Sequence, residues 1–557
     1  MSAKLKILSL SLLLSIPLAS TALERISLLP PEAQSYVRIS NTTNFWSQLK
    51  QSSLGKLWAD QQFQDFLGNP DVETWQELFF DGETDAEDDV FIEQFKMLKG
   101  EIILAFDMEM EDPYIIAAMA GDDFIRSLEM DAKLLEITED PFEIVKSTFQ
   151  DVEIVQHIEN GGTPEEESSW QAHLNNTLVL GYTKEWVEKC IVQLQKATIK
   201  EPEGNPDFNL NLPLSGMIRK FIEDEKEDLD GSPDPMNTEL LFEALGLLGI
   251  DNYSLKVELK DTEMVADSNL LVSDLTRGFF TLLDVRPSEL PTVGFIPENI
   301  ASLEVGRFNL LRFWQEVPNV LATAMPAVKP QFDMIVAMIQ QQAGIDFEQD
   351  LLANIGTEYV SFSLTESDRQ TSTIAVELKD GMAFKTGLET ALAAPALQPQ
   401  IAAGLEIEEF LDHTIYTVKD DDPESAIAFG VMGDYLLYGQ PDGLRQVIRS
   451  ESSDTATNGS FERSPLVKGL REHVPPRAFG YSAIDWKKNM DVIVREFSKP
   501  EYVGLMQQKW AKSGSPLPPP DFDKLPSADH IASFFNVSYQ YAEATGDGLH
   551  QKIILKY

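Results

Sequence analysis

The chain has 557 residues, with 91 acidic residues against 44 basic ones and a formal net charge of −47 at pH 7. So acidic a chain repels phosphate backbones and anionic membrane surfaces, and it has no Lys/Arg cluster to neutralise them, which excludes nucleic acid as a partner. With 43% hydrophobic residues it can bury large cores, so disorder throughout is also excluded.

The first 22 residues predict a signal peptide. Lys4 and Lys6 precede the apolar run ILSLSLLLSIPLA, and residues 20–22, Ser-Thr-Ala, are small enough for cleavage. The run is shorter than the roughly 20 residues of a membrane span, and no later segment is long and uncharged enough to supply one. We therefore expect export to the periplasm or the medium, with no integral membrane segment after cleavage.

Residues 23–283 predict a first α+β half. A strand in QSYVRIS leads into helices in FWSQLKQSSLGKLWADQQFQDFL, then two strands, EIILAFDME and PYIIAAMAG. A helix from Phe124, three short strands and the helix around KEWVEKCI follow, and a strand-helix unit with SLKVELKD and EMVADSNLLV closes the half. Short loops between consecutive strands favour antiparallel pairing.

Residues 284–299, where prolines and a glycine interrupt the pattern, predict a linker, and residues 300–557 predict a second half with the same order. Five landmarks recur at a nearly constant offset: Gly100 and Gly356, Phe124 and Phe384, Val152 and Leu405, Gly181 and Gly439, and Ile191 and Ile448. The predicted fold is therefore α+β, in two tandem similar halves, each an antiparallel sheet with helices packed on one face.

The start of the first half carries PPEAQSYVRI, then SSLGKL from Ser52, then DQQFQDF from Asp60. This pattern resembles the start of a family of exported bacterial proteins described as a domain of unknown function. The resemblance implies export and a repeated α+β build, and the family brings no established catalytic residues. The second half keeps Pro297-Glu298 but lacks a counterpart of the Leu54-Gly55 turn.

The single cysteine, Cys190, has two possible roles, as a nucleophile or as a packing residue in a core. It shares one helical face with Val187, Ile191 and Leu194, and the second half places Val447 at its position. Buried free cysteine commonly behaves as a small hydrophobe. We predict a packing role rather than a nucleophile.

The histidines show no metal-ligand spacing such as HExxH, so we predict isolated structural rings and neither a metal nor a cofactor site. The six are His157, His173, His413, His473, His530 and His550. The landmark match of Val152 to Leu405 aligns His157 with Phe410, a strand position, which favours a partly buried ring.

Two acidic loops invite a calcium interpretation, because carboxylates at alternating positions can supply oxygen ligands. They contain Asp81, Glu83 and Asp85, and Asp228, Asp230 and Gly231. The first loop lacks the glycine and terminal glutamate of a calcium loop, and the second has Lys226 where the first ligand belongs. We interpret both as solvated surface loops, with weak calcium binding left open.

Trp46 and Trp58 lie on helical segments, and Phe313-Trp314 repeats Phe45-Trp46 after the first strand of the second half. Such rings can stack on sugars. Because they are twinned at strand-to-helix junctions, we predict instead that they lock helix to sheet.

No motif identifies a reaction, since neither GxSxG nor GxxxxGK occurs and the abundance of carboxylates makes any pair uninformative. The catalytic residues are therefore unknown, and we expect an exported non-catalytic binding or assembly protein whose partner is an unknown protein or envelope component. The alternatives are an extracytoplasmic hydrolase acting on a polymer and a carrier of an apolar ligand. A cleft with carboxylates at catalytic distance favours the first, and a large dry cavity the second.

We expect the mature protein to begin at Leu23, because charge and hydrophobicity change sharply after Ala22. N-terminal sequencing of the protein from the envelope fraction is the measurement. An intact Met1 in a cytosolic fraction would contradict the export prediction.

Overall fold

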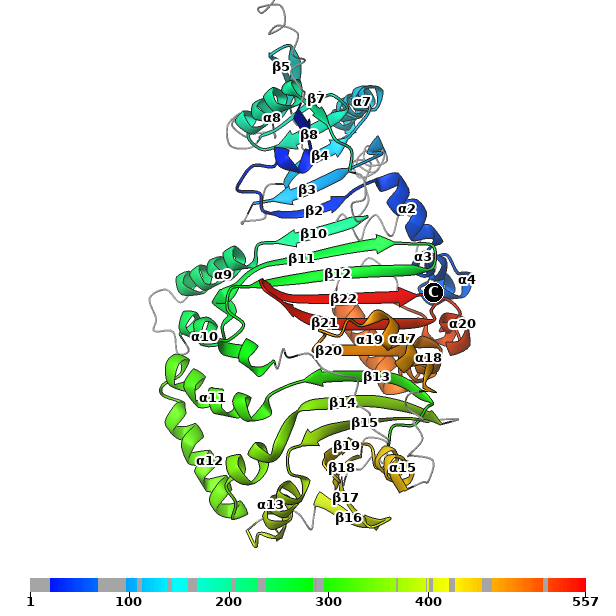
Figure 1. The fold of residues 1–557 in the computed structure, drawn as a ribbon. Helices are drawn as coiled ribbons and strands as arrows, with labels where there is room; N and C mark the ends of the chain where they lie inside the picture. Colours follow the sequence, from blue (N-terminus) through cyan, green and yellow to red (C-terminus); the bar gives the residue numbers. More distant parts are fainter. Residues whose placement is uncertain are drawn as a thin grey trace, which may run out of the picture. The chain divides into compact units, whose positions relative to one another are not determined.

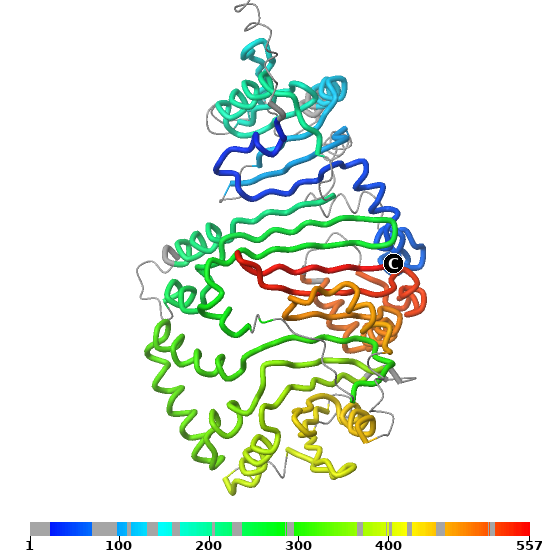
Figure 2. The backbone as a smooth tube through the Cα atoms, in the orientation of Figure 1, coloured from blue at the N-terminus to red at the C-terminus, as the bar shows by residue number. Residues whose placement is uncertain are grey.

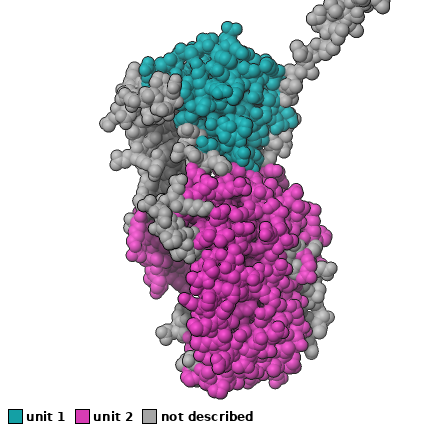
Figure 3. All heavy atoms as spheres, turned by 90° about the vertical axis from the view of Figure 1, so that its left-hand side faces the viewer, with its two compact units in different colours: residues 1–48, 71–212 teal, residues 49–70, 213–557 magenta. Residues whose placement is uncertain are grey.

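The computed structural model describes most of the chain in two compact units (Figures 1 and 3). The first unit contains the described residues of 1–48 and 71–212, and the second contains those of 49–70 and 213–557. The described residues are 21–68, 97–107, 113–137, 143–158, 168–202, 207–228, 237–283, 286, 295–366, 369–396, 398–399, 404–419, 426–452, 463–513 and 519–557. Most of the predicted signal peptide, residues 1–20, therefore lies outside them.

The first unit contains an antiparallel sheet in the order β10-β2-β3-β4-β8-β7-β6-β5 (Figure 1). The strands are β2 (Ser35–Ile39), β3 (Ile102–Phe106), β4 (Pro113–Ala118), β5 (Glu143–Phe149), β6 (Val152–Ile158), β7 (Ser168–Leu174), β8 (Thr177–Gly181) and β10 (Phe208–Leu212). Apart from this sheet, β1 (Thr21–Leu23) pairs in parallel with β9 (Ala197–Ile199).

Helices cover both faces of this sheet, namely α7 (Gly121–Ile137) and α8 (Lys184–Lys196). Ile103 of β3 belongs to a core that includes Val187 of α8. Its neighbour Ile102 points the other way, into a core that includes Phe124 of α7. The prediction of one covered face is wrong here, because β3 is apolar at successive positions.

A buried ion cluster fixes the segment that follows β1. Arg25 donates to Glu101 at 3.2 Å and to the two carboxylate oxygens of Glu201 at 3.0 and 2.9 Å. Arg38 donates to the other oxygen of Glu101 at 2.7 Å. Burial lowers the pKa of Arg25, but the hydrogen bonds and charges of Glu201 and Glu101 outweigh it and raise the pKa, so the guanidinium stays charged.

The second unit contains a longer antiparallel sheet, in the order β11-β12-β22-β21-β20-β13-β14-β15-β19-β18-β17-β16. Its strands are β11 (Ile250–Leu259), β12 (Glu263–Val272), β13 (Ile300–Arg307), β14 (Ile355–Glu366), β15 (Arg369–Leu378), β16 (Leu405–Phe410), β17 (His413–Val418), β18 (Ile427–Met432), β19 (Tyr435–Gly439), β20 (Gly480–Asp485), β21 (Val537–Thr545) and β22 (Gly548–Lys556).

The compact units do not follow the predicted boundary at 284–299, because β12 pairs with β22 at the end of the chain. The register runs from Glu263 opposite Lys556 to Leu271 opposite Gly548, and Figure 2 shows the green β12 beside the red β22. The last hairpin of the predicted first half is thus part of the second unit's sheet, and the units divide at residues 212/213.

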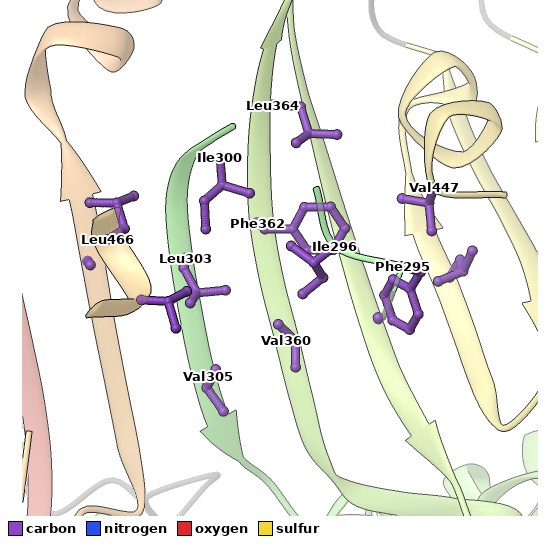
Figure 4. Packing of buried hydrophobic residues seen from close by; sticks show 14 of the residues in the cluster. Phe295, Ile296, Ile300, Leu303, Val305, Val360, Phe362, Leu364, Val447 and Leu466 are labelled. Atoms are coloured by element: carbon purple, nitrogen blue, oxygen red, sulfur yellow. The ribbon is translucent and has the colours of Figure 1, made fainter. Parts of the chain in front are cut away.

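One face of this sheet packs on α15 (Pro441–Ser452) and α17 (Pro465–His473). Leu303 of β13 and Phe362 of β14 meet Val447 and Leu466 of these helices in one buried cluster (Figure 4). Strand alternation gives neighbouring strands the same apolar face, so one continuous core forms.

The opposite face is covered in part by α11 (Leu310–Ala324), α12 (Lys329–Ala343) and α13 (Gly381–Ala393). Val376 of β15 and Leu436 of β19 pack there with Phe384 of α13. Helices therefore lie on both faces of this sheet as well. Further α-helices in the described part of the unit are α3 (Ser53–Trp58), α4 (Gln61–Phe66), α9 (Leu214–Asp228), α10 (Thr238–Ala244), α18 (Trp486–Phe497), α19 (Pro500–Ser513) and α20 (Ala528–Ala532), while α2 (Thr42–Gln51) spans the unit boundary.

Two sets of strands share one order of pairing. The order β10-β2-β3-β4-β8-β7-β6-β5 corresponds strand by strand to β20-β13-β14-β15-β19-β18-β17-β16. In both sets a helix, α8 or α15, follows the strand that ends at Gly181 or Gly439.

The hairpin turns correct one of the predicted landmarks. Gln150 and Asp151, between β5 and β6, have φ angles of 47° and 64°, and Leu411 and Asp412, between β16 and β17, have 47° and 66°. These turns correspond, so Val152 corresponds to His413 and not to Leu405. The predicted match was wrong because it overlooked β5, and adjacent strands of a hairpin share the same alternating pattern.

We expect Glu101→Gln to lower the free energy of unfolding by about 3–5 kcal/mol, because it leaves two buried guanidinium groups without their shared carboxylate. Glu201, whose side chain is 65% exposed, provides the control. Glu201→Gln is expected to cost less than about 1 kcal/mol. Urea denaturation measures both variants, and equal losses would contradict the assignment of the cluster as a buried structural element.

Candidate binding groove

A hollow of about 450 Å³ lies in the second unit across four adjacent strands, β14, β13, β20 and β21. Its lining includes Leu283, Ser302, Glu304, Gly306, Tyr359, Ser361, Gly480, Ser482, Ile484, Gln540 and Ala542. We call this hollow the groove.

The groove occupies the face opposite the core of Figure 4. Leu303 and Val305 of β13 point into that core, so Ser302, Glu304 and Gly306 point the other way. Strand alternation thus gives one surface of β13 to packing and the other to the groove.

Glycine and small side chains make room for the groove. A Cβ atom at Gly306 would lie 2.6 Å from the hydroxyl oxygen of Tyr359, so any larger residue here would displace the tyrosine ring that crosses β13. On β20, Gly480 and Ser482 add little volume. The floor of the groove is therefore mainly backbone and short side chains.

Polar groups of the groove are held in fixed positions. The Tyr359 hydroxyl donates to Glu304 Oε1 at 2.7 Å. Burial and the neighbouring Glu304 carboxylate raise the pKa of Tyr359, so its phenol stays protonated at neutral pH. The hydroxyls of Ser302 and Ser363 share a hydrogen bond of 2.6 Å. A polar ligand would meet donors and acceptors that are already oriented.

Arg307 and Glu304 are the charged side chains in the described lining of the groove. Arg307 donates to Glu358 at 3.1 Å, and both side chains are 19% exposed. Glu304 is exposed, and it carries the one carboxylate among the described lining residues. The described lining therefore offers one carboxylate, whereas a glycosidase of the usual kind uses two.

A second polar cluster joins three strands on the opposite face of the sheet. His550 of β22 lies between Glu543 of β21, at 3.0 Å from Nδ1, and Asp267 of β12, at 2.9 Å from Nε2. Each ring nitrogen of His550 therefore lies within hydrogen-bond distance of a carboxylate oxygen. Arg477 also donates to Glu543, whose side chain is 2% exposed. This arrangement neutralises a buried carboxylate.

Sequence reasoning did not find this cluster. Asp267 and His550 are 283 residues apart, and only the pairing of β12 with β22 brings them together. An Asp and a His at alternating strand positions give no usable signal by themselves.

Cys190 is fully buried in the core of the first unit, with Sγ 3.7 Å from the carbonyl oxygen of Leu28. Burial raises the pKa of its thiol to about 12. Val447 is also fully buried, in the core of the second unit, so both residues that the sequence matched pack in a core.

The other histidines lie apart from the groove's lining residues. His173 Nε2 is 2.8 Å from the Met119 carbonyl oxygen, His413 Nε2 is 3.6 Å from Glu451, His473 Nε2 is 2.8 Å from Lys556 Nζ, and His530 Nε2 is 2.8 Å from Asp60. Burial and the Lys556 charge lower the pKa of His473, so its neutral ring can accept a hydrogen bond from the ammonium group. His157 is partly buried in β6.

In the described part of the chain, no group of three or more His, Cys, Asp or Glu could hold a metal ion. No helix in the same residues is both long and apolar enough to cross a bilayer. Asp228 ends α9, and the other residues of the two acidic loops, Asp81, Glu83, Asp85, Asp230 and Gly231, lie outside the described residues.

The predicted packing of the aromatic residues holds for Trp314 and not for Trp46 and Trp58. Trp46 and Trp58 are 45% and 39% exposed, so they do not lock helix to sheet. Trp314 of α11 packs against a core that includes Ile355 of β14 and Leu378 of β15, and its ring centroid lies 5.8 Å from that of Phe332 and 5.2 Å from that of Phe347. The likeness of Phe45-Trp46 to Phe313-Trp314 therefore does not reflect one packing role.

Comparison with known proteins gives little more. No protein-family model matches the chain, and no curated protein matches it. Two crystal structures of TP0453 are similar over about half of the chain. Form I is 10% identical with a TM-score of 0.24, covering 46% of this chain and 82% of TP0453, and form III is 7% identical with a TM-score of 0.25, covering 48% and 90%. Scores this low carry no argument about fold or function.

We expect Cys190→Val to change the free energy of unfolding by less than about 1.5 kcal/mol, because valine roughly conserves the buried volume. The native thiol should also resist a disulfide reagent at pH 8, where a pKa of about 12 leaves only roughly one thiolate in 10⁴. Labelling kinetics with and without urea test this. Rapid labelling of the folded protein would contradict the packing role.

Proposed function

We propose that this chain is an exported, non-catalytic binding protein that holds a small polar ligand in the groove. The observation that carries the proposal is the groove itself, a hollow of about 450 Å³ whose described lining combines a fixed Tyr359–Glu304 pair with serine and glutamine side chains. Ligand sites typically measure about 300–1,000 Å³ and have a few convergent polar groups.

The lining favours binding over the two alternatives. A hydrolase requires a nucleophile beside a base, or two carboxylates flanking the bond. Ser302 instead shares its hydrogen bond with another serine, Ser363. An apolar carrier would be lined almost entirely by apolar side chains. The groove has a mixed lining instead, in which Ser361, Ser482 and Gln540 lie beside apolar residues such as Ile484.

We also propose that the two halves are copies of one α+β unit. The shared strand order and the matching turns at Gln150-Asp151 and Leu411-Asp412 support this. Periplasmic or secreted location remains part of the proposal and rests on the predicted signal peptide.

The test is ligand binding to the purified mature protein, followed by thermal unfolding in the presence of sugars, amino acids and short peptides. We expect at least one compound to raise Tm, because a ligand that binds only the folded state stabilises it by about 2.7 kcal/mol at 100 times its Kd. Ser482→Trp should fill the groove and weaken that ligand at least about tenfold. The control is Ser147→Trp, at an exposed position in β5 of the first unit, which should leave the affinity unchanged.

Equal loss of affinity in both tryptophan variants would contradict the groove as the site. Turnover of a polymer that Ser482→Trp abolishes would establish the hydrolase instead. Tight binding of fatty acids in preference to every polar compound would favour the apolar carrier.

A further inference from the structure

Helix α12 exposes a continuous aliphatic surface. Met334, Ile335, Met338 and Ile339 are 67%, 47%, 48% and 51% exposed. They recur at spacings of one and four residues, so they lie on one side of the helix. We call these four side chains the α12 surface.

The inner side of α12 is apolar as well. Phe332 packs against Trp314 of α11, and Ala343 is buried in the core beneath α13. From Met334 to Ile339 every side chain of α12 is apolar, and the polar residues of the helix lie toward its two ends. A helical stretch that is apolar on all sides is normally buried on all sides, so the α12 surface has the composition of a covered surface.

Charge is depleted around this helix. Lys329 and Asp333 are the only charged residues from Val317 to Ile345, although charged residues make up 24% of the chain. The two form an ion pair with each other. In a chain with a net charge of −47, this segment is electrically neutral.

We propose that the α12 surface docks onto a lipid bilayer with zwitterionic headgroups. Aliphatic side chains without charge match acyl chains, whereas protein interfaces draw their binding energy mainly from Trp, Tyr and Arg. Anionic lipids would repel the acidic remainder of the chain. This inference is independent of the groove.

The size of the surface favours lipid over a second copy of the chain. Fifteen residues make a helix about 22 Å long and about 10 Å wide, a footprint of roughly 220 Å², against about 800 Å² per partner in a stable protein complex. The same length is below the roughly 30 Å of a bilayer core, so the helix lies in the interface and does not span.

Flotation of the full mature chain with phosphatidylcholine vesicles at 0.15 M salt tests the proposal. We expect the wild type to float with the vesicles and Met334→Glu/Met338→Glu to float at least about tenfold less, because charge is expelled from the apolar boundary. The uncharged Met338→Gln is expected to give an intermediate loss, and circular dichroism confirms that each variant is folded.

The matched control is Ile407→Glu on β16, where the isoleucine is 57% exposed. It should float like the wild type. Absence of wild-type flotation, or equal flotation of the wild type and the double variant, would overturn the proposal. A wild-type dimer in sedimentation that Met334→Glu/Met338→Glu dissociates, without vesicle binding, would assign the α12 surface to a second copy.

Discussion

The pairing of β12 with β22 is the constraint on which the second unit depends. It joins a hairpin that precedes residue 284 to the last strand of the chain, in an unbroken register from Glu263–Lys556 to Leu271–Gly548. At its end, a Cβ atom on Gly548 would lie 2.1 Å from the carbonyl oxygen of Leu270, at a φ of 150°. Glycine is therefore required where β22 begins beside β12.

In each unit a buried carboxylate forms an ion pair with at least one arginine. Glu101 in the first unit lies against Arg25 and Arg38, and Glu543 in the second lies against Arg477 and His550. Removing a carboxylate from water costs several kcal/mol unless cations and hydrogen bonds replace the lost hydration. A chain with so many acidic residues can leave nearly all of them in solvent, and these two buried ones have cationic partners.

The two-faced sheet explains how one scaffold offers two different surfaces. Alternate residues of β13 and β20, such as Leu303 and Ala483, point into the core with α15 and α17. The residues between them, such as Glu304 and Ser482, point to the other face and line the groove. Helices α11 to α13 cover part of this second face, and the outer side of α12 carries the aliphatic surface.

The sequence by itself determined local properties. Alternation and helical periodicity predicted the strands in IILAF and YLLYG and the apolar face around Cys190, because a side chain's direction follows from its position in the element. The α+β class followed from the order of these elements. The sequence could not show that helices cover both faces of each sheet, because an apolar run such as Ile102-Ile103 indicates a buried strand but not which helices pack on it.

Only the tertiary structure decided which distant residues meet. The groove forms because Gly306, Tyr359 and Ser482 lie on neighbouring strands. The second polar cluster forms because Asp267 lies beside His550. Strand register sets these neighbours, and one missed strand, β5, was enough to align Val152 with Leu405 instead of His413. Pairing between strands far apart in sequence depends on the whole set of packing energies, which no local pattern contains.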